Sequence, residues 1–281
     1  MSAVPMDTAL PVIALVALAC MAIAGGCVDT GDGAAGRVSA MTELMTLQGG
    51  VAADLASLGD IAGDAADAVS ETDGDWPAAT ADLDILGAGT PPIHRIVYID
   101  ETGTVRCNQT GPGPDLVGEH LTFQKSVADA IEEKVPVMTD DFELTDGTRA
   151  TALYYPVFDA AGLYRGFVSV AFVPADLIRP HADGIRDRTG FSVMAAQPDG
   201  LILYDPDPEE IGTETFTNPM YEEYPQILAF ARTCAGEWSG RDMYTFPDIG
   251  FESTVTQEAV WTTVPMWENE WRVFVMRTFA E

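Results

Sequence analysis

The sequence is short of basic residues, and this shortage excludes one large class of partners. Lysine and arginine together number 14 against 44 aspartates and glutamates, so the formal net charge is −30 at pH 7. Lysine stands only at Lys125 and Lys134. A protein that binds nucleic acid needs a basic face to pair with phosphate groups. We therefore expect no nucleic-acid partner, and an acidic surface that keeps the protein hydrated and soluble.

Cysteine, histidine and catalytic motifs are scarce as well. The chain has four cysteines and three histidines in 281 residues. Neither His94 nor His181 has a second histidine or cysteine at metal-ligand spacing, and Cys107 and Cys234 suggest no disulfide framework. No G-x-S-x-G, HExxH or P-loop motif occurs. We expect no metal site, no cofactor and no enzymatic activity, and the acidic run at 205–210 reads as a solvated loop rather than a calcium site.

The longest apolar run lies at the N-terminus. Residues 9–26 carry no charge. The length of this uncharged run lies between that of a signal-peptide core and that of a membrane span. Small residues then lead into Cys27, and this junction resembles a lipobox, which implies that Cys27 receives lipid. An uncleaved anchor and an ordinary signal peptide are the alternatives. In each case the protein is exported, and the lipid or uncleaved anchor would hold it at the outer face of the cytoplasmic membrane.

The rest of the chain divides into segments with different patterns of apolar and β-branched residues. Apolar residues recur every three or four positions from 38 onward, which predicts an amphipathic helix, either continuous or broken. Two sets of β-branched and aromatic segments follow, and each runs in the order two strands, a helix and three strands. The expected division is a signal sequence or anchor at 1–27, a flexible tether at 28–37, a long helix at 38–89, a first module at 90–175, a connecting helix at 176–189 and a second module at 190–281.

The two modules match each other in detail. The segment VYIDETGTVRCN parallels VMAAQPDGLILYD, which places Gly103 opposite Gly200 at the turn of a hairpin. The Asp side chain caps such a turn and Gly accepts its positive φ. Pro156 lies opposite Pro265 in the closing hairpins. The chain is thus predicted to be α+β, with a long helix before two antiparallel-sheet modules.

These motifs resemble a known family. A strand, a D-x-x-G turn, a strand, a helix and the hairpin YYPVFDAAGLYRGFVSVAF resemble a Cache domain, which is a PAS-like module. Two of them after a long helix resemble the double Cache architecture of extracytoplasmic sensors. The resemblance implies that the membrane-distal unit holds a small metabolite and that the long helix transmits the signal.

The resemblance also suggests where a ligand would bind. Cationic and phenolic groups in the first module would suit a small polar or anionic metabolite, above all one with a carboxylate. The candidates at the start of the pocket helix, and on or beside a strand of the sheet, are His120, Phe123, Lys125, Arg149, Tyr154 and Tyr155. Tyr154 and Tyr155 point to opposite faces, so one of them belongs to the core. FQKSV and Ala171 depart from the signature of the family's amino-acid-binding subgroup, so amino-acid recognition of that kind is not expected.

The sequence is compatible with three functions. The favoured one is a membrane-anchored ligand-binding sensor without its own output domain, which would pass its message to a separate membrane signalling protein. The alternative is a ligand-free docking module for a membrane signalling or transport partner. The least favoured is a cell-surface hydrolase, which would need a serine beside His120.

Overall fold

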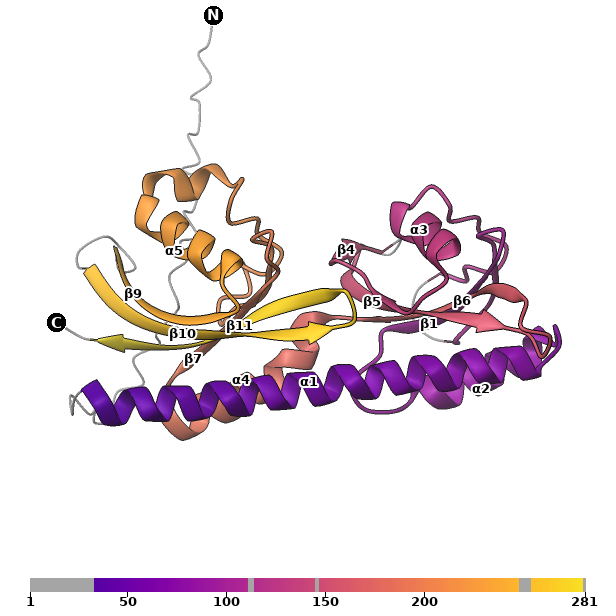
Figure 1. Cartoon of the computed structure of the whole chain (residues 1–281), viewed down its shortest axis with the longest axis horizontal. Helices are drawn as coiled ribbons and strands as arrows, with labels where there is room; N and C mark the ends of the chain where they lie inside the picture. The colour runs from indigo at the N-terminus through magenta and orange to yellow at the C-terminus, as the bar shows by residue number, and fades with distance from the viewer. Residues whose placement is uncertain (1–32, 111–113, 145–146, 248–253, 280–281) are drawn as a thin grey trace, which may run out of the picture.

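A single helix runs the length of the molecule and carries both modules. The computed structural model describes residues 33–110, 114–144, 147–247 and 254–279, so the predicted lipid-attachment residue Cys27 lies outside the described residues. Helix α1 (Gly33–Glu71) has 39 residues and lies beneath both sheets (Figure 1). At 1.5 Å per residue it spans about 58 Å. Among the described residues, no helix combines the length and apolar character needed to cross a bilayer.

The helical region begins earlier than predicted. Part of the predicted tether is helical, because α1 begins at Gly33. Gly36 is the point where this first stretch meets the second module, since a Cβ there would lie 1.9 Å from Nη1 of Arg277. The close approach explains why a glycine-rich stretch is held in a helix: tertiary packing offsets its low helix propensity.

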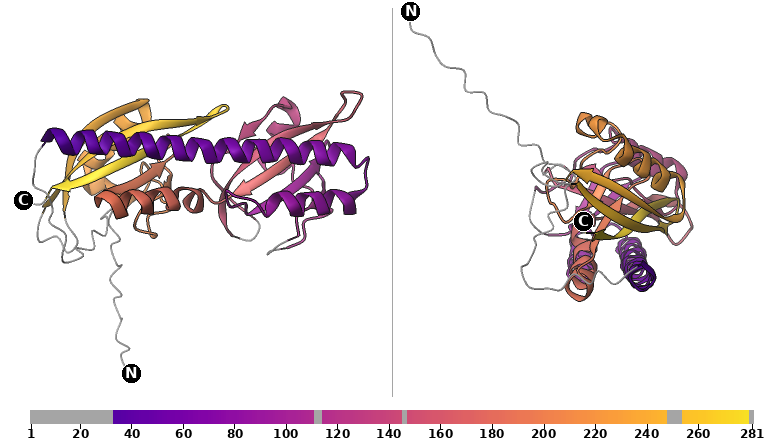
Figure 2. Two further views of the ribbon diagram at one scale, coloured as in Figure 1. Left: turned by 90° about the horizontal axis from the view of Figure 1, so that it is seen from below. Right: turned by 90° about the vertical axis from the view of Figure 1, so that its left-hand side faces the viewer.

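The predicted helix over 38–89 is broken into two. After α1, Asp73 and Gly74 adopt left-handed conformations with φ values of 47° and 88°. Helix α2 (Trp76–Gly87) then begins at the cap Asp75, whose Oδ1 accepts a hydrogen bond from the Ala78 N–H at 3.3 Å. The chain therefore reverses, and α2 packs beside α1 under the first module (Figure 2).

The first module is an antiparallel sheet with one helix above it. The strand order is β2-β1-β6-β5-β3, and β4 pairs with β5 outside this path. Helix α3 lies over the face that is turned away from α1 (Figure 1). The elements are β1 (Arg95–Asp100), β2 (Val105–Asn108), α3 (Lys125–Glu133), β3 (Val137–Met138), β4 (Phe142–Glu143), β5 (Arg149–Phe158) and β6 (Tyr164–Phe172).

The second module repeats this plan. Helix α4 (Pro174–Thr189) leads into it alongside α1, and its sheet has the order β8-β7-β11-β10-β9. Its elements are β7 (Ser192–Ala196), β8 (Ile202–Tyr204), the 3-10 helix η1 (Pro219–Glu223), α5 (Pro225–Gly236), β9 (Ser239–Pro247), β10 (Thr254–Met266) and β11 (Asn269–Phe279). The α+β class with a long N-terminal helix and two antiparallel modules is confirmed.

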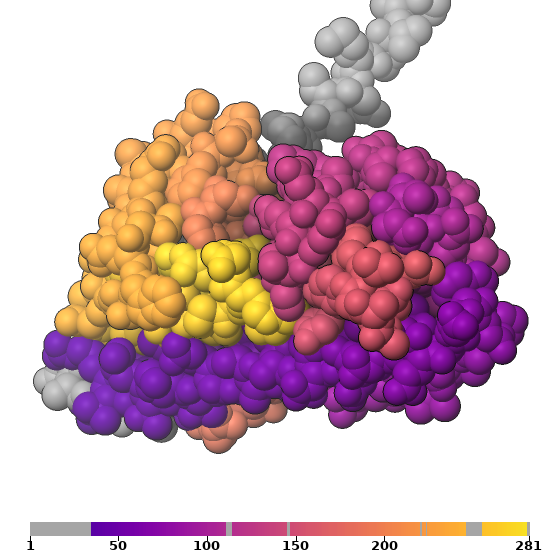
Figure 3. Space-filling model, turned by 45° about the vertical axis from the view of Figure 1, so that its right-hand side comes forward, coloured from indigo at the N-terminus to yellow at the C-terminus, as the bar shows by residue number. Residues whose placement is uncertain are grey.

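Each sheet uses its two faces differently. In the first module Ile96, Tyr98 and Leu153 pack toward α1, whereas Val97 and Tyr154 belong to the cluster under α3. The alternation follows from the period of two along a strand. Helix α1 contributes an apolar stripe of Leu44, Leu47, Val51, Leu55 and Leu58, all fully buried or nearly so. Figure 3 shows α1 as a ridge that underlies both modules.

The two modules also contact each other directly. The Asn269 side chain, at the β10–β11 turn, donates to the Met138 carbonyl at 3.2 Å and to Oδ1 of Asp140 at 3.1 Å. The backbone N–H of Asp141 donates to Oε1 of Gln197 at 2.7 Å. The first module is thus coupled to the second both through α1 and across this interface.

Candidate ligand site

The first module contains a cavity between its sheet and α3. Its volume is about 60 Å³. The walls come from strands β1, β4, β5 and β6, from α3 and from the loop before it, and are mostly apolar. The lining residues include Val97, Ile99, Leu116, Leu121, Val127, Phe142, Leu144 and Ala171. A cavity of this kind, with a few polar groups on apolar walls, is typical of a small-molecule site.

Several polar side chains converge on this cavity. Arg95, Tyr154 and Ser169 line it, together with His94 and Gln124. The strand register explains why Arg95, Tyr154 and Ser169 share one face of the sheet. Ser169 of β6 lies between Val97 of β1 and Tyr154 of β5, and Arg95 lies two residues before Val97 on β1. Side chains of such aligned positions share one face of the sheet. The cavity therefore combines a guanidinium, a phenol and a hydroxyl.

The two strongest polar groups are held in place. Arg95 is 8% exposed, and its Nη1 donates to the carbonyl of Pro114 at 2.7 Å. The Tyr154 hydroxyl lies 3.2 Å from the Ser126 hydroxyl of α3. Burial raises the pKa of Tyr154 to about 12, so the phenol stays protonated and can donate a hydrogen bond. Both groups are thus fixed before any ligand arrives.

Of the two adjacent tyrosines, only Tyr154 faces this cavity. Tyr155 points to the opposite face, where a Cβ at Gly63 of α1 would lie 3.7 Å from its Cζ. Its ring also packs 6.5 Å from that of Trp267, measured between centroids. The sequence required the two rings to diverge, and the structure places Tyr155 in the contact between sheet and long helix.

The other predicted ligand residues lie outside the cavity. Phe123 is 76% exposed, and the Lys125 side chain is 87% exposed and pairs with Asp129 one turn later in α3. Nε of Arg149 donates to Oδ2 of Asp141 at 2.7 Å. A Cβ at Gly212 would lie 3.1 Å from Cδ of Arg149, so Arg149 lies at the boundary with the second module. None of these side chains lines the cavity.

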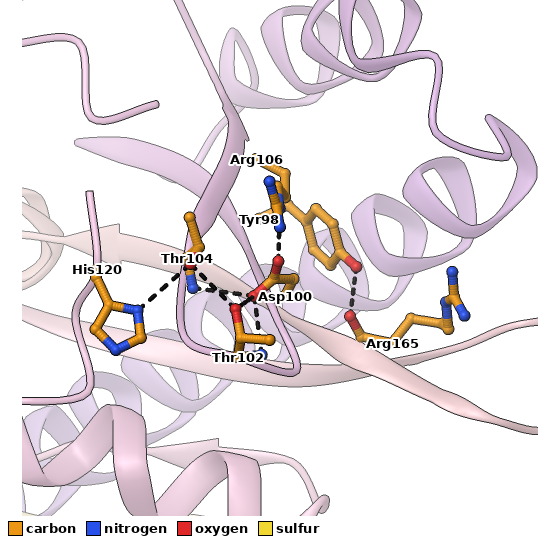
Figure 4. Close-up of polar contacts among 7 residues, drawn as sticks. All are labelled: Tyr98, Asp100, Thr102, Thr104, Arg106, His120 and Arg165. Carbon is orange, nitrogen blue, oxygen red and sulfur yellow. Dashed lines mark hydrogen bonds and ion pairs between the residues drawn. The ribbon is translucent and has the colours of Figure 1, made fainter. Parts of the chain in front are cut away.

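His120 also lies away from the cavity, beside the β1–β2 hairpin. Its Nδ1 lies 3.4 Å from the Thr104 hydroxyl (Figure 4). Its Nε2 lies 2.8 Å from the Thr122 hydroxyl. Both partners are threonines, and neither is the serine that the hydrolase hypothesis requires. The hydroxyl neighbours sit on an exposed surface, which gives them no enclosed site for a reaction.

The β1–β2 hairpin shows how the predicted D-x-x-G turn is built. Oδ1 of Asp100 accepts from the Thr102 N–H at 2.9 Å and from the Thr104 N–H at 3.0 Å, and Oδ2 accepts from Nε of Arg106 at 2.5 Å (Figure 4). Burial alone would raise the pKa of Asp100, but these hydrogen bonds outweigh burial and lower it. A buried, charged Asp100 thus fixes the end of β1, the strand that begins with Arg95.

The prediction of a solvated loop at 205–210 holds for the middle of the run and is wrong at its two ends. Asp205 and Glu210 are 2% and 1% exposed. Oε2 of Glu210 accepts a hydrogen bond from the Tyr221 hydroxyl at 2.6 Å. Pro206 and Pro208 between them are exposed, so the run is solvated between two buried carboxyl groups. Within the described residues, no group of three or more potential ligand side chains could hold a metal ion.

Sequence reasoning missed Arg95, Ser169, Gln124 and His94. Arg95 shares the cavity face with Val97 and Ile99 because it lies two and four positions before them in one strand. That alternation was visible in the sequence. The sequence did not show which of the two faces carries the cavity, because strand β1 is buried along its whole length.

Comparison with known proteins agrees with this geometry. Residues 53–174 match the family model described as HK/GC/chemotaxis protein-like, sensor domain. An extracellular ligand binding receptor from Desulfohalobium retbaense is 22% identical, with a TM-score of 0.70 over 84% of this chain and 39% of that one. The present chain therefore spans about two fifths of that receptor structure. No curated protein matches the chain.

Two further structures have bound ligands. The ligand binding domain of Mlp24 with asparagine is 14% identical, with a TM-score of 0.57 over 85% of this chain and 90% of that one. The ligand binding domain of the Pseudomonas aeruginosa amino acid chemoreceptor PctC in complex with GABA is 16% identical, with a TM-score of 0.56 over 83% of this chain and 96% of that one. The chain thus has the Cache-like fold of extracellular sensor domains of chemoreceptors and histidine kinases. The predicted double Cache resemblance is confirmed.

Proposed function

We propose that this protein is an extracytoplasmic, membrane-anchored sensor that binds a small carboxylate-bearing metabolite in the cavity of its first module. The observation that carries the proposal is the convergence of Arg95, Tyr154 and Ser169 on one mostly apolar cavity. An arginine binds a carboxylate with two parallel charge-assisted hydrogen bonds, and a buried phenol or hydroxyl adds a further donor. The protein acts by binding, with no catalytic step.

The side chains that line the cavity restrict the chemical class of the ligand. No aspartate or glutamate is among the described residues that line the cavity. The ammonium group of an amino acid would lack an anionic partner there, and burying an unpaired charge is costly. Tyr154, Ser169 and Gln124 can instead pair with hydroxyl or carbonyl groups. The ligand is therefore a small hydroxy or oxo acid.

The size of the cavity supports a small ligand. A volume of about 60 Å³ exceeds the roughly 10–15 Å³ that one water needs and is less than the roughly 150 Å³ of an engineered cavity that holds benzene. Asparagine and GABA, bound in two of the similar structures, both carry a carboxylate. An open cavity also favours ligand binding over the alternative of a ligand-free docking module.

The arrangement of the chain suits an N-terminal anchor. The start of α1 and the end of β11 lie at the same end of the molecule, beside the second module (Figure 1). A lipid on Cys27 or an uncleaved segment at 1–27 would place the second module near the membrane and the first module far from it. Ligand binding above β1 and β5 would then act on α1, which contacts both sheets, and so reach a separate membrane signalling protein.

The test is a binding measurement on the full chain. Lactate, glycolate and pyruvate are titrated by calorimetry, with asparagine, GABA and ethanolamine alongside. A ligand that binds only the folded state also raises the melting temperature, by an amount equivalent to about 2.7 kcal/mol at a hundred times its Kd. Arg95→Gln is expected to weaken acid binding at least tenfold. Lys125→Gln, which alters an exposed cation outside the cavity, is the matched control and should leave affinity unchanged.

The outcomes are distinct. Saturable binding of an acid that Arg95→Gln weakens and Lys125→Gln does not supports the proposal. A flat titration with all the acids, or equal loss in both variants, contradicts it. Preferential binding of asparagine or GABA would contradict the exclusion of amino acids while leaving a first-module sensor in place.

A further inference from the structure

The second module has a cavity of its own. It lies between the sheet and α5, on the face turned away from α1, and its volume is about 60 Å³. Its walls include Met194, Ile202, Ile227, Phe230 and Phe274. Like those of the first-module cavity, they are mostly apolar, with a few polar side chains among them.

One charged side chain, Arg272, contributes to this lining. It stands on β11, two residues before Phe274, between Ala196 of β7 and Thr263 of β10. Its exposed fraction is 4%. A buried arginine is rare in proteins unless its donors are satisfied, so its hydrogen bonds decide its role.

Arg272 is fixed on two sides and lacks a partner on the third. Its Nε donates to the Cys234 carbonyl at 2.9 Å, and its Nη2 donates to the Ala235 carbonyl at 3.1 Å and to Oε1 of Glu270 at 2.9 Å. Nη1 is buried and has no hydrogen-bond partner among the described residues. Leaving a buried charged donor unpaired costs free energy. The end of α5 thus holds a guanidinium that lines the cavity and keeps one buried donor unpaired.

The neighbouring polar groups have partners already or are neutral. The Tyr244 hydroxyl donates to Oε1 of Gln257 at 2.7 Å, while its ring stacks 4.6 Å from that of Phe230. Burial raises the pKa of the Cys234 thiol, so it stays protonated. Oε1 of Gln197 accepts from the Asp141 N–H. Thr215 adds a hydroxyl to the lining. The cavity therefore offers a largely apolar surface with one charged donor, the guanidinium of Arg272.

We infer that this cavity is a second binding site, for a short-chain carboxylate such as propionate. A carboxylate oxygen accepts the hydrogen bond from Nη1 of Arg272, and the alkyl group packs against Phe230 and Phe274. Glu270 is partly exposed and pairs with Nη2, so it leaves Nη1 to the ligand. The volume of about 60 Å³ favours a short alkyl chain over an aromatic ring, because it is well below the roughly 150 Å³ of an engineered cavity that holds benzene.

The experiment titrates the full chain with propionate by calorimetry. Phenylacetate tests the size limit, and propylamine tests the need for a hydrogen-bond acceptor. Arg272→Gln removes the donor and is expected to weaken propionate binding at least tenfold. Ala231→Leu, on the cavity side of α5, fills the space without touching Arg272 and is expected to do the same. Ala229→Leu, exposed on the same helix, is its matched control.

Arg95→Gln separates the two sites. Propionate binding that survives Arg95→Gln but is lost in Ala231→Leu and not in Ala229→Leu establishes the second site. If Arg272→Gln fails to fold because α5 loses its C-terminal partner, Ala231→Leu still decides. No binding of propionate, loss with Arg95→Gln alone, or equal effects of the two leucine variants would overturn the inference, as would tighter binding of phenylacetate or propylamine.

Discussion

Nε2 of His181 lies 2.7 Å from Oδ2 of Asp54 and joins the connecting helix α4 to the long helix α1. This contact depends on a glycine one turn earlier. A Cβ at Gly50 would lie 2.5 Å from Cε1 of His181, whereas a Cβ at the adjacent Gly49 meets nothing within 4 Å. Two neighbouring glycines in one helix therefore have different reasons to be there.

Gly49→Ala and Gly50→Ala should have opposite effects on stability. Alanine in a helix interior is favoured over glycine by about 0.5–1 kcal/mol. We expect Gly49→Ala to raise the free energy of unfolding by that amount. Gly50→Ala should lower it, because the new methyl group displaces His181 from Asp54. Urea denaturation of both variants measures the difference.

The cause can be isolated in a second background. With His181→Ala in place, the steric conflict is gone, so Gly50→Ala should stabilise as Gly49→Ala does. If Gly50→Ala still destabilises there, the imidazole is not the reason for the glycine.

Asp205 should make the protein less stable as the pH rises. Burial raises its pKa to about 8. The folded carboxyl therefore keeps its proton up to about that pH, whereas the unfolded one, with its model value of 3.8, releases its proton near pH 4. Between these values the folded state binds more protons, so the free energy of unfolding falls with rising pH. Each pKa unit corresponds to about 1.4 kcal/mol.

Asp205→Asn removes this dependence. We expect the variant to approach the parent in stability near pH 4 and to be the more stable protein at pH 8, in denaturant titrations at both values. Glu209→Gln, at an exposed carboxylate of the same loop, should show no such trend. A difference between Asp205→Asn and the parent that stays constant with pH would refute the explanation.

Asp100 should have the opposite pH dependence. The hydrogen bonds from Thr102, Thr104 and Arg106 lower its pKa in the folded state. Its stabilising effect is therefore fully present above the unfolded pKa, near 4, and is lost as the pH falls through the folded value. Asp100→Asn should destabilise the protein by about 1–3 kcal/mol at pH 7 and by less at low pH. Thermal unfolding at several pH values tests this, with exposed Glu101→Gln as the neutral control.

Adjacent tyrosines separate ligand binding from helix packing. Tyr154→Phe removes a hydroxyl from the first-module cavity and should weaken binding of a hydroxy acid about fivefold or more, because a buried ligand group loses its donor. Tyr155→Phe keeps the ring that packs near Gly63 and should leave the affinity unchanged. Calorimetric titration of both variants with lactate is the measurement. Equal affinities in the two would place the ligand elsewhere.

The site was harder to predict than the fold. Strand alternation required Tyr154 and Tyr155 to diverge, and the turn chemistry at Asp100 and Gly103 was visible in the sequence. His120, Phe123 and Lys125 were selected from their place at the start of a helix, yet the residues of that segment that line the cavity are Leu121 and Gln124. Arg95 was overlooked because an arginine at the start of a strand has the pattern of a solvated charge until the strands beside it bury it.

The sequence by itself determined the acidic surface, the α+β class, the order of elements and the repeat of two modules, because these follow from composition, local periodicity and turn residues. Only the tertiary structure decided that the long helix breaks after Glu71, that Asp205 and Glu210 are buried, and that Arg95 and Arg272 each reach a cavity. Those outcomes depend on which strands pair and which faces are covered, and such long-range packing is not encoded in any short stretch of the chain.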